Sequence, residues 1–166
     1  MASGNLYAEF DALGGVPPAS AYATLDMTAA DVPVLEFDDG ADESVYFRFR
    51  MPDGYDGSSG LTVVVGWKFA TFVGSQTCAW KAAFYRVADD ADSIESATFA
   101  SDQASGAVTE ASATGEISYD TIAFTNAQAD GIQPNEWCIL RIKRDAASGT
   151  ASPGDAQLAF VAVKET

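Results

Sequence analysis

Apolar and polar residues alternate with a period of two over much of the chain. In the segment 45–50 the apolar residues alternate with Tyr46 and two arginines, and the segments 61–70 and 77–87 repeat the arrangement. This alternation predicts strands with one dry and one wet face. Further strands are expected at 21–25, 32–37, 107–109, 117–125, 137–144 and 156–163. The one helix we expect is short and lies within 93–99.

Eight or nine strands in 166 residues, separated by clusters of Gly, Pro, Asp and Ser, fit a single all-β domain. We predict an antiparallel two-sheet sandwich over residues 21–166. A jelly roll is the most economical arrangement for that number of strands.

The first 20 residues differ from the rest, because their apolar residues follow neither the strand period nor the helix period. Gly14-Gly15 and Pro17-Pro18 interrupt any regular element. Two interpretations stay open, a frayed terminus or edge strand and an extended arm that binds a neighbouring subunit. We favour the arm, because a solvated tail gains nothing from large apolar side chains. Its predicted partner contacts are Leu6, Tyr7, Phe10, Leu13, Val16, Pro17 and Pro18.

The charge balance excludes several classes of function. Nine basic and 24 acidic residues give a net charge of −15, which repels nucleic acid and anionic membrane surfaces. The chain has no histidine, so every mechanism that needs an imidazole is excluded. Cys78 and Cys138 lie in apolar runs and are expected to be reduced core residues. No signal peptide or membrane-spanning run is visible, and synthesis in a cytoplasm is expected.

Two acidic clusters are the candidates for a metal site. Calcium needs six to eight oxygen ligands, and a turn with four carboxylates supplies several of them. Neither cluster has the spacing of an EF-hand, so a solvated acidic turn is the simpler interpretation, and no metal or cofactor is predicted. The clusters are Asp38, Asp39, Asp42 and Glu43, and Asp89, Asp90, Asp92 and Glu95.

Aromatic residues offer a second chemistry, because a row of exposed rings on a sheet can stack on sugars. Most such rings in a sandwich belong to its core. Tyr46, Tyr85 and Trp137 are the residues through which a carbohydrate-binding module would act. Trp67 and Tyr119 complete the set considered. A hydrolase that uses Glu36, which we expect to point to solvent, is a weaker hypothesis.

Several stretches resemble a family of small β-rich virion proteins of tailed bacteriophages. They are Leu13–Asp26, Pro33–Asp39, Gly60–Val63, Arg141–Ala147 and the final Lys164-Glu165-Thr166. The resemblance implies a non-enzymatic cement protein, often trimeric, that decorates the exterior of the capsid by binding the major capsid protein.

The sequence therefore predicts a capsid decoration protein that holds its partner through the N-terminal arm. A second set of contacts with an acidic shell consists of Arg48, Arg50, Arg141, Lys143 and Arg144. The alternative is a carbohydrate-binding β-sandwich module of a phage tail or fibre.

Overall fold

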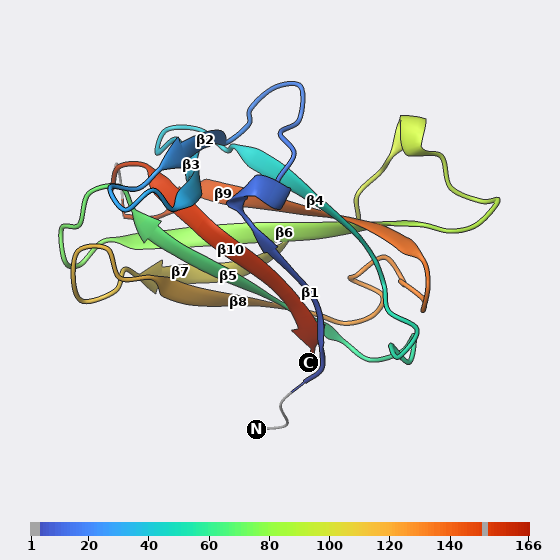
Figure 1. Cartoon of the computed structure of the whole chain (residues 1–166). Coiled ribbons are helices and arrows are strands. Elements are labelled where there is room, and N and C mark those ends of the chain that lie inside the picture. Colours follow the sequence, from blue (N-terminus) through green and yellow to red (C-terminus); the bar gives the residue numbers. More distant parts are fainter. Residues whose placement is uncertain (1–3, 151–152) are drawn as a thin grey trace.

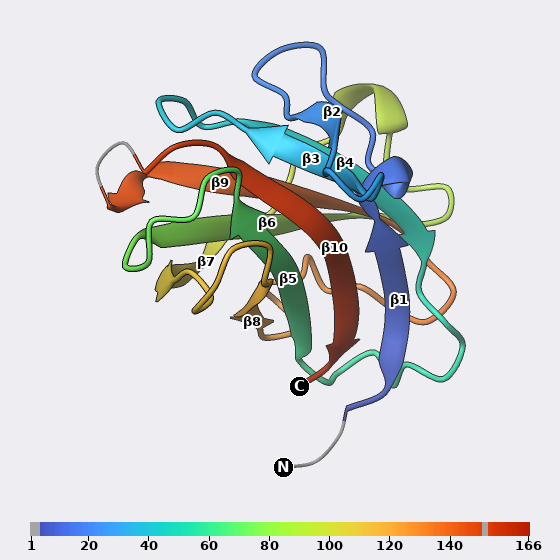
Figure 2. The same cartoon turned by 60° about the vertical axis from the view of Figure 1, so that its left-hand side comes forward.

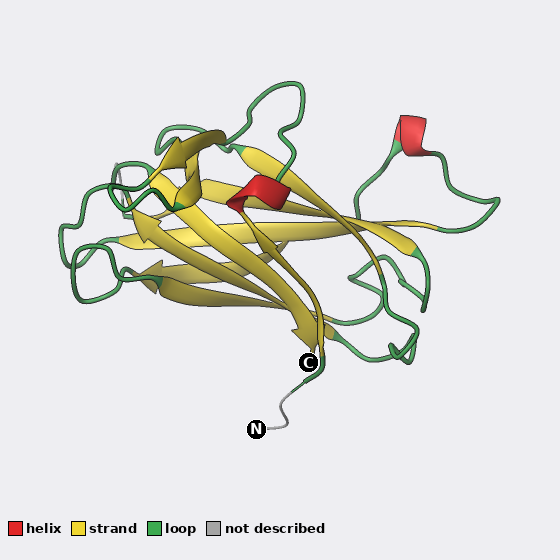
Figure 3. Ribbon diagram, viewed as in Figure 1, coloured by secondary structure: helices red, strands yellow, loops and turns green. Residues whose placement is uncertain are grey.

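The computed structural model describes residues 4–150 and 153–166, and in this part of the chain ten strands form two antiparallel sheets packed face to face (Figure 1). The only helices in it are two short 3-10 turns, η1 (Ala12–Gly14) and η2 (Ile94–Ser96) (Figure 3). The all-β two-sheet sandwich is thereby confirmed. Within the described residues, no helix is long and apolar enough to cross a bilayer. The strands are β1 (Leu6–Asp11), β2 (Thr24–Met27), β3 (Pro33–Phe37), β4 (Ser44–Arg50), β5 (Leu61–Phe69), β6 (Thr77–Val87), β7 (Gln103–Thr109), β8 (Ser118–Phe124), β9 (Trp137–Gly149) and β10 (Ala156–Glu165).

Sheet A has the strand order β2-β3-β10-β5-β8, and sheet B has the order β4-β9-β6-β7. Strand β10 is the centre of sheet A. One of its edges pairs with β5, and the other is shared by two strands (Figure 2). β3 pairs with residues 156–158 of that edge, and β1 pairs with residues 160–164.

The core lies between the inner faces of the two sheets. The period-two pattern places Val63, Val65 and Trp67 of β5 there, all fully buried. Rings from different strands meet edge to face, and the Phe37 and Trp80 centroids lie 5.0 Å apart. Burial of each such side chain contributes about 1.5–3 kcal/mol, so the core is the main source of stability.

The two cysteines are buried and free, as expected from the sequence. Burial raises the pKa of each thiol, Cys78 and Cys138, to about 12. Both therefore remain protonated, unreactive parts of the core at neutral pH.

The N-terminal segment is an edge strand rather than a projecting arm, which corrects the interpretation that we favoured. Residues 6–11 pair with β10, and the backbone of Val16 pairs with that of Tyr46. The Phe10 ring stacks on Phe47 with the centroids 5.1 Å apart, and Tyr7 packs against the core. The physical reason is that β3 leaves β10 after Leu158, and β1 supplies hydrogen-bond partners for the edge that remains.

A long loop, residues 88–102, follows β6 and carries η2 at the end of the molecule where it projects furthest (Figures 1 and 3). Phe99 fixes this loop to the outer face of sheet B, where its ring lies 5.3 Å from Tyr46 and 6.1 Å from Tyr85. The predicted short helix is present here as η2.

Candidate functional site

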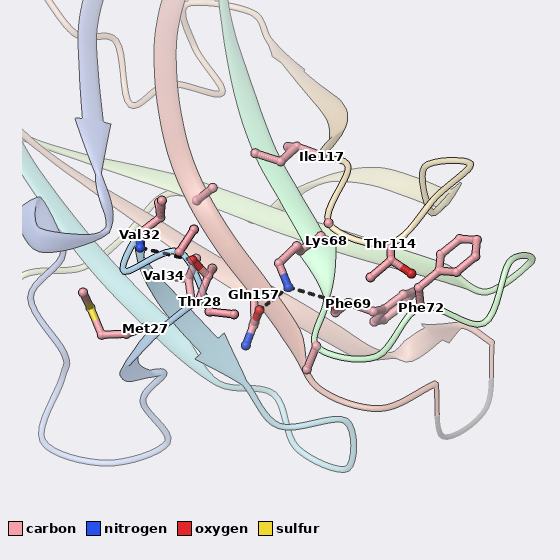
Figure 4. Close-up of a pocket in the computed structure, with 15 residues that line it drawn as sticks. Met27, Thr28, Val32, Val34, Lys68, Phe69, Phe72, Thr114, Ile117 and Gln157 are labelled. Atoms are coloured by element: carbon pink, nitrogen blue, oxygen red, sulfur yellow. Dashed lines mark hydrogen bonds between the residues drawn. The ribbon is translucent and has the colours of Figure 1, made fainter.

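An apolar groove, here called the sheet A groove, lies on the outer face of sheet A (Figure 4). Its volume is about 540 Å³. The β2–β3 hairpin forms one wall with Met27 and Val32, and the loops around Phe72 and Ile117 form the other. Lys68 and Gln157, from the paired strands β5 and β10, lie between the walls.

The polar side chains of the groove are bound to one another. The Lys68 ammonium donates to Gln157 Oε1 and to the Phe69 carbonyl oxygen. The Gln157 amide in turn donates to Glu36 Oε2 at 2.8 Å and to Asp26 Oδ2 at 3.4 Å. Desolvation lowers the pKa of Lys68. Glu36 is therefore a half-buried member of a hydrogen-bond chain and not the solvent-directed carboxylate that we expected.

A second hollow, here called the Trp137 cleft, lies at the end of sheet B where β4 and β6 end and β9 begins. The strand register places Trp137 between Arg50 and Val87. The segments 88–92 and 134–136 complete the walls, and the volume is about 880 Å³. Trp137 is 37% exposed, although tryptophan is usually a core residue in a sandwich.

Fewer of the polar groups around Trp137 have hydrogen-bond partners within the protein than those of the groove. Arg50 donates from Nε to the Asn135 carbonyl oxygen at 2.7 Å. In the described part of the chain, the terminal guanidinium nitrogens of Arg50 have no protein partner, and neither do the exposed carboxylates of Asp89 and Asp90. The cleft thus combines an exposed aromatic ring with donors and acceptors that can bind hydroxyl groups.

The five aromatic residues that the sequence singled out have three different environments. Trp67 is fully buried, and Tyr85 is buried with its hydroxyl donating to the Ser93 carbonyl oxygen at 2.9 Å. Tyr46 is covered by Phe99. The preference for Tyr85 was wrong, because the loop 88–102 covers the face on which it lies.

Trp137 and Tyr119 are the two members of that set with exposed rings. Tyr119 lies on the outer face of sheet A, 66% exposed, and its ring meets Phe160 edge to face. Phe160 lies against the backbone of Gly66, where any side chain would clash with its ring.

The acidic turn at residues 38–43 uses its carboxylates to hold its own backbone. Asp38 accepts from the Gly40 amide, and Glu43 accepts from the Asp38 amide. Asp39 accepts from Gly154, and Asp42 accepts from Ala146 and pairs with Lys143. In the described residues, no three acidic or cysteine side chains are arranged to hold a metal ion.

Most of the basic residues expected to face an acidic shell are engaged within the protein. Arg141 and Lys143 both pair with Asp102, at 2.8 and 3.3 Å. Arg144 is 2% exposed and donates to the carbonyl oxygens of Phe37 and Gly154, so its assignment as a surface contact was wrong. A buried guanidinium is retained only when its hydrogen bonds are made, and these two carbonyl groups provide them.

No protein-family model matches the sequence, and no curated protein matches it. Solved structures do match. The xylan-binding module CBM15 superposes with a TM-score of 0.51 at 13% identity, over 98% of this chain and 98% of that chain. The family GH115 4-O-methyl-alpha-glucuronidase BtGH115A gives 0.52 at 10% identity, over 99% of this chain but 18% of the enzyme. A family 6 carbohydrate-binding module gives 0.49 at 9% identity, over 96% and 95% of the two chains. At these identities the first two superpositions show a shared fold.

Proposed function

We propose that this protein is a non-catalytic carbohydrate-binding β-sandwich and that the Trp137 cleft is its sugar site. The observation that carries the proposal is the exposed Trp137 indole beside polar groups of Arg50, Asp89 and Asp90 that have no protein partner. A sugar ring has an apolar C–H face and a rim of hydroxyl groups. Stacking on the indole and hydrogen bonding to the rim therefore satisfy both parts of the ligand together.

The electrostatics favour a neutral glycan. Arg50 is the one basic residue that lines the cleft, whereas Asp89, Asp90, Asp92 and Glu136 are acidic. The whole chain carries a net charge of −15. A polyanionic glycan would be repelled over a range of about 8 Å at physiological ionic strength, whereas a neutral oligosaccharide would not.

The structural relatives support the fold on which the proposal rests. A module named for xylan binding has this two-sheet architecture over nearly its whole length. Xylan is a reasonable first probe for this reason, but the residues of the cleft, not the likeness, decide which glycan is bound.

A glycan array followed by isothermal titration calorimetry tests the proposal. We expect Trp137→Ala to weaken binding of the best neutral oligosaccharide by about tenfold or more, as loss of a central aromatic contact does. Tyr119→Ala is the matched control, because it removes another exposed aromatic ring from the opposite sheet and should leave the affinity unchanged. Equal affinity of wild type and Trp137→Ala, or loss of binding in the Tyr119 variant alone, would move the site away from the cleft.

Membership of a phage virion stays a prediction. Capsid attachment through a projecting arm loses its basis, because β1 is part of sheet A. A glycan-binding role on a tail or fibre needs no arm, and mass spectrometry of purified virions with localisation by electron microscopy would test it.

A further inference from the structure

Three polar side chains form a row across the outer face of sheet A. The strand register places Gln157 of β10 directly opposite Lys68 of β5 on one side and Glu36 of β3 on the other. Side chains paired in this way are close, because their Cβ atoms lie about 4.5–5.5 Å apart. Gln157 is 6% exposed, although glutamine is usually a surface residue. The row therefore belongs to the packed part of the sheet and not to its solvated surface.

The Lys68 amine lies next to the Gln157 carboxamide in a position from which it can react. Lys68 Nζ donates to Gln157 Oε1 at 2.5 Å (Figure 4). Because a carbonyl carbon lies about 1.2 Å from its oxygen, Nζ is no more than about 3.7 Å from Gln157 Cδ. Groups that react in a folded site start from about 3–3.5 Å, and the flexible lysine side chain can cover the difference.

The surroundings of Lys68 favour a nucleophilic amine. An attack on a carbonyl carbon needs the neutral form of the amine, because an ammonium has no free electron pair. The side chain lies between the apolar walls of the sheet A groove, and desolvation there lowers the pKa of Lys68. Removal of a lysine from water is an established way in which proteins make its amine reactive.

Carboxylates lie beside the nitrogen atom that would leave. Gln157 Nε2 donates to Glu36 Oε2 at 2.8 Å and to Asp26 Oδ2 at 3.4 Å. An amide nitrogen becomes a good leaving group only when it is protonated, and a carboxyl group within hydrogen-bond distance can deliver the proton. Glu36 makes the shorter contact and is the better placed of the two acids for this task.

We propose that Lys68 and Gln157 form an isopeptide bond within the chain, with Glu36 as the proton carrier. The bond from Nζ to Cδ forms, and the bond from Cδ to Nε2 breaks. The Lys68 ammonium gives up two protons to solvent, and Nε2 takes up two by way of the Glu36 carboxyl group and leaves as ammonium. The reaction needs no oxidant, reductant or further reactant. Its product joins β5 to β10 covalently, so the two strands stay linked when the domain unfolds.

Intact-mass spectrometry and peptide mapping of the folded full chain test the proposal. The mass should be lower than that of the sequence by one ammonia. Trypsin does not cleave after an acylated lysine, so the digest should contain residues 51–81 joined to residues 145–164. Fragmentation of this joined pair should place the link between Lys68 and Gln157.

Two variants separate the reaction from the fold. Lys68→Arg keeps the positive charge, but arginine does not lose its proton in proteins, so this variant should keep the full mass. Glu36→Gln keeps the shape of the row and removes the proton carrier, so the bond should form about a hundredfold more slowly. Lys81→Arg is the matched control, because Lys81 pairs with Asp145 on sheet B and this variant should link like wild type. Circular dichroism verifies that each variant is folded.

A folded wild type whose mass stays equal to that of its sequence overturns the proposal. So does a loss of ammonia that persists in Lys68→Arg, or a link that maps to another pair of residues. Undiminished linkage in Glu36→Gln overturns the role of Glu36. Trp137→Ala should form the bond normally, since none of the three residues of the row lines the Trp137 cleft, and this result separates the bond from the proposed sugar site.

Discussion

The sheet A groove and the Trp137 cleft are hollows on opposite sheets of one sandwich, and they differ in what their polar side chains bind. In the groove, Lys68, Gln157 and Glu36 are bound to one another. In the cleft, Asp89 and Asp90 face solvent beside an exposed indole. Polar groups that satisfy each other stabilise the fold, whereas polar groups left open can bind a ligand. The comparison thus assigns a structural role to the polar side chains of the groove and a binding role to those of the cleft.

The largest expected effect comes from the most deeply buried carboxylate of sheet A. Asp120 on β8 is 1% exposed and accepts a hydrogen bond from the Ser105 hydroxyl at 3.3 Å. Burial raises the pKa of Asp120 to about 6, above its ordinary value of 3.8. The folded state therefore holds a proton that the unfolded state releases, and stability falls as the pH rises from about 4 to about 6.

We expect Asp120→Asn to remove this loss, which amounts to at most about 3 kcal/mol above pH 6. Urea unfolding of both proteins at pH 4.5 and 7.5 measures it. The difference between variant and wild type should grow with pH, while sugar affinity stays equal. Measuring that difference cancels the opposite trends of other carboxylates, such as Asp145, whose pKa is lowered by its contact with Lys81. A constant difference at the two pH values would contradict the role of Asp120.

Much of the fold could be predicted from the sequence, because an alternating pattern is the direct consequence of a strand with one buried face. The segment 45–50 is β4, and 61–70 and 77–87 are β5 and β6 within one residue. For residues 6–11 the sequence favours an arm over an edge strand, because the apolar residues there follow no clean period. The edge of β10 decides the pairing of β1, and this is a long-range property that no local pattern contains.

The second-largest expected effect tests whether the hydrogen-bond chain of the groove stabilises the fold without contributing to sugar binding in the cleft. Gln157→Leu removes the link between Lys68 and Glu36 and leaves a half-buried ammonium and carboxylate without their partner. We expect a loss of about 2 kcal/mol in the free energy of unfolding. Urea denaturation measures it, and titration calorimetry should show unchanged sugar affinity. A stability equal to that of wild type would show that the groove network is dispensable.

The candidate site could be predicted only in part, and for a physical reason. Trp137 was identified as a candidate from the sequence, but its neighbours come from the ends of β4 and β6, from the loop 88–102 and from the segment 134–136. The same loop covers Tyr46 and Tyr85, which period two alone places on an open face. Loop placement depends on contacts such as Phe99, whose partners lie far from it in the chain, so alternation carries no signal for it.

The smallest effect concerns the two open carboxylates of the cleft. The double variant Asp89→Asn and Asp90→Asn should change the free energy of unfolding by less than about 0.5 kcal/mol, because both groups are exposed and unpaired within the described residues. Asparagine also suits the positive φ of 54° at position 90.

The same double variant should change the ligand preference of the cleft. Because the amide accepts hydrogen bonds less strongly than the carboxylate, we expect neutral-glycan affinity to fall only about threefold. Binding of a uronate-containing oligosaccharide should rise, since two negative charges are removed. Titration calorimetry with both ligands measures this change of preference. If the double variant loses stability as Gln157→Leu does, or leaves the preference unaltered, the cleft would be a structural surface like the groove, and the distinction between the two hollows would fail.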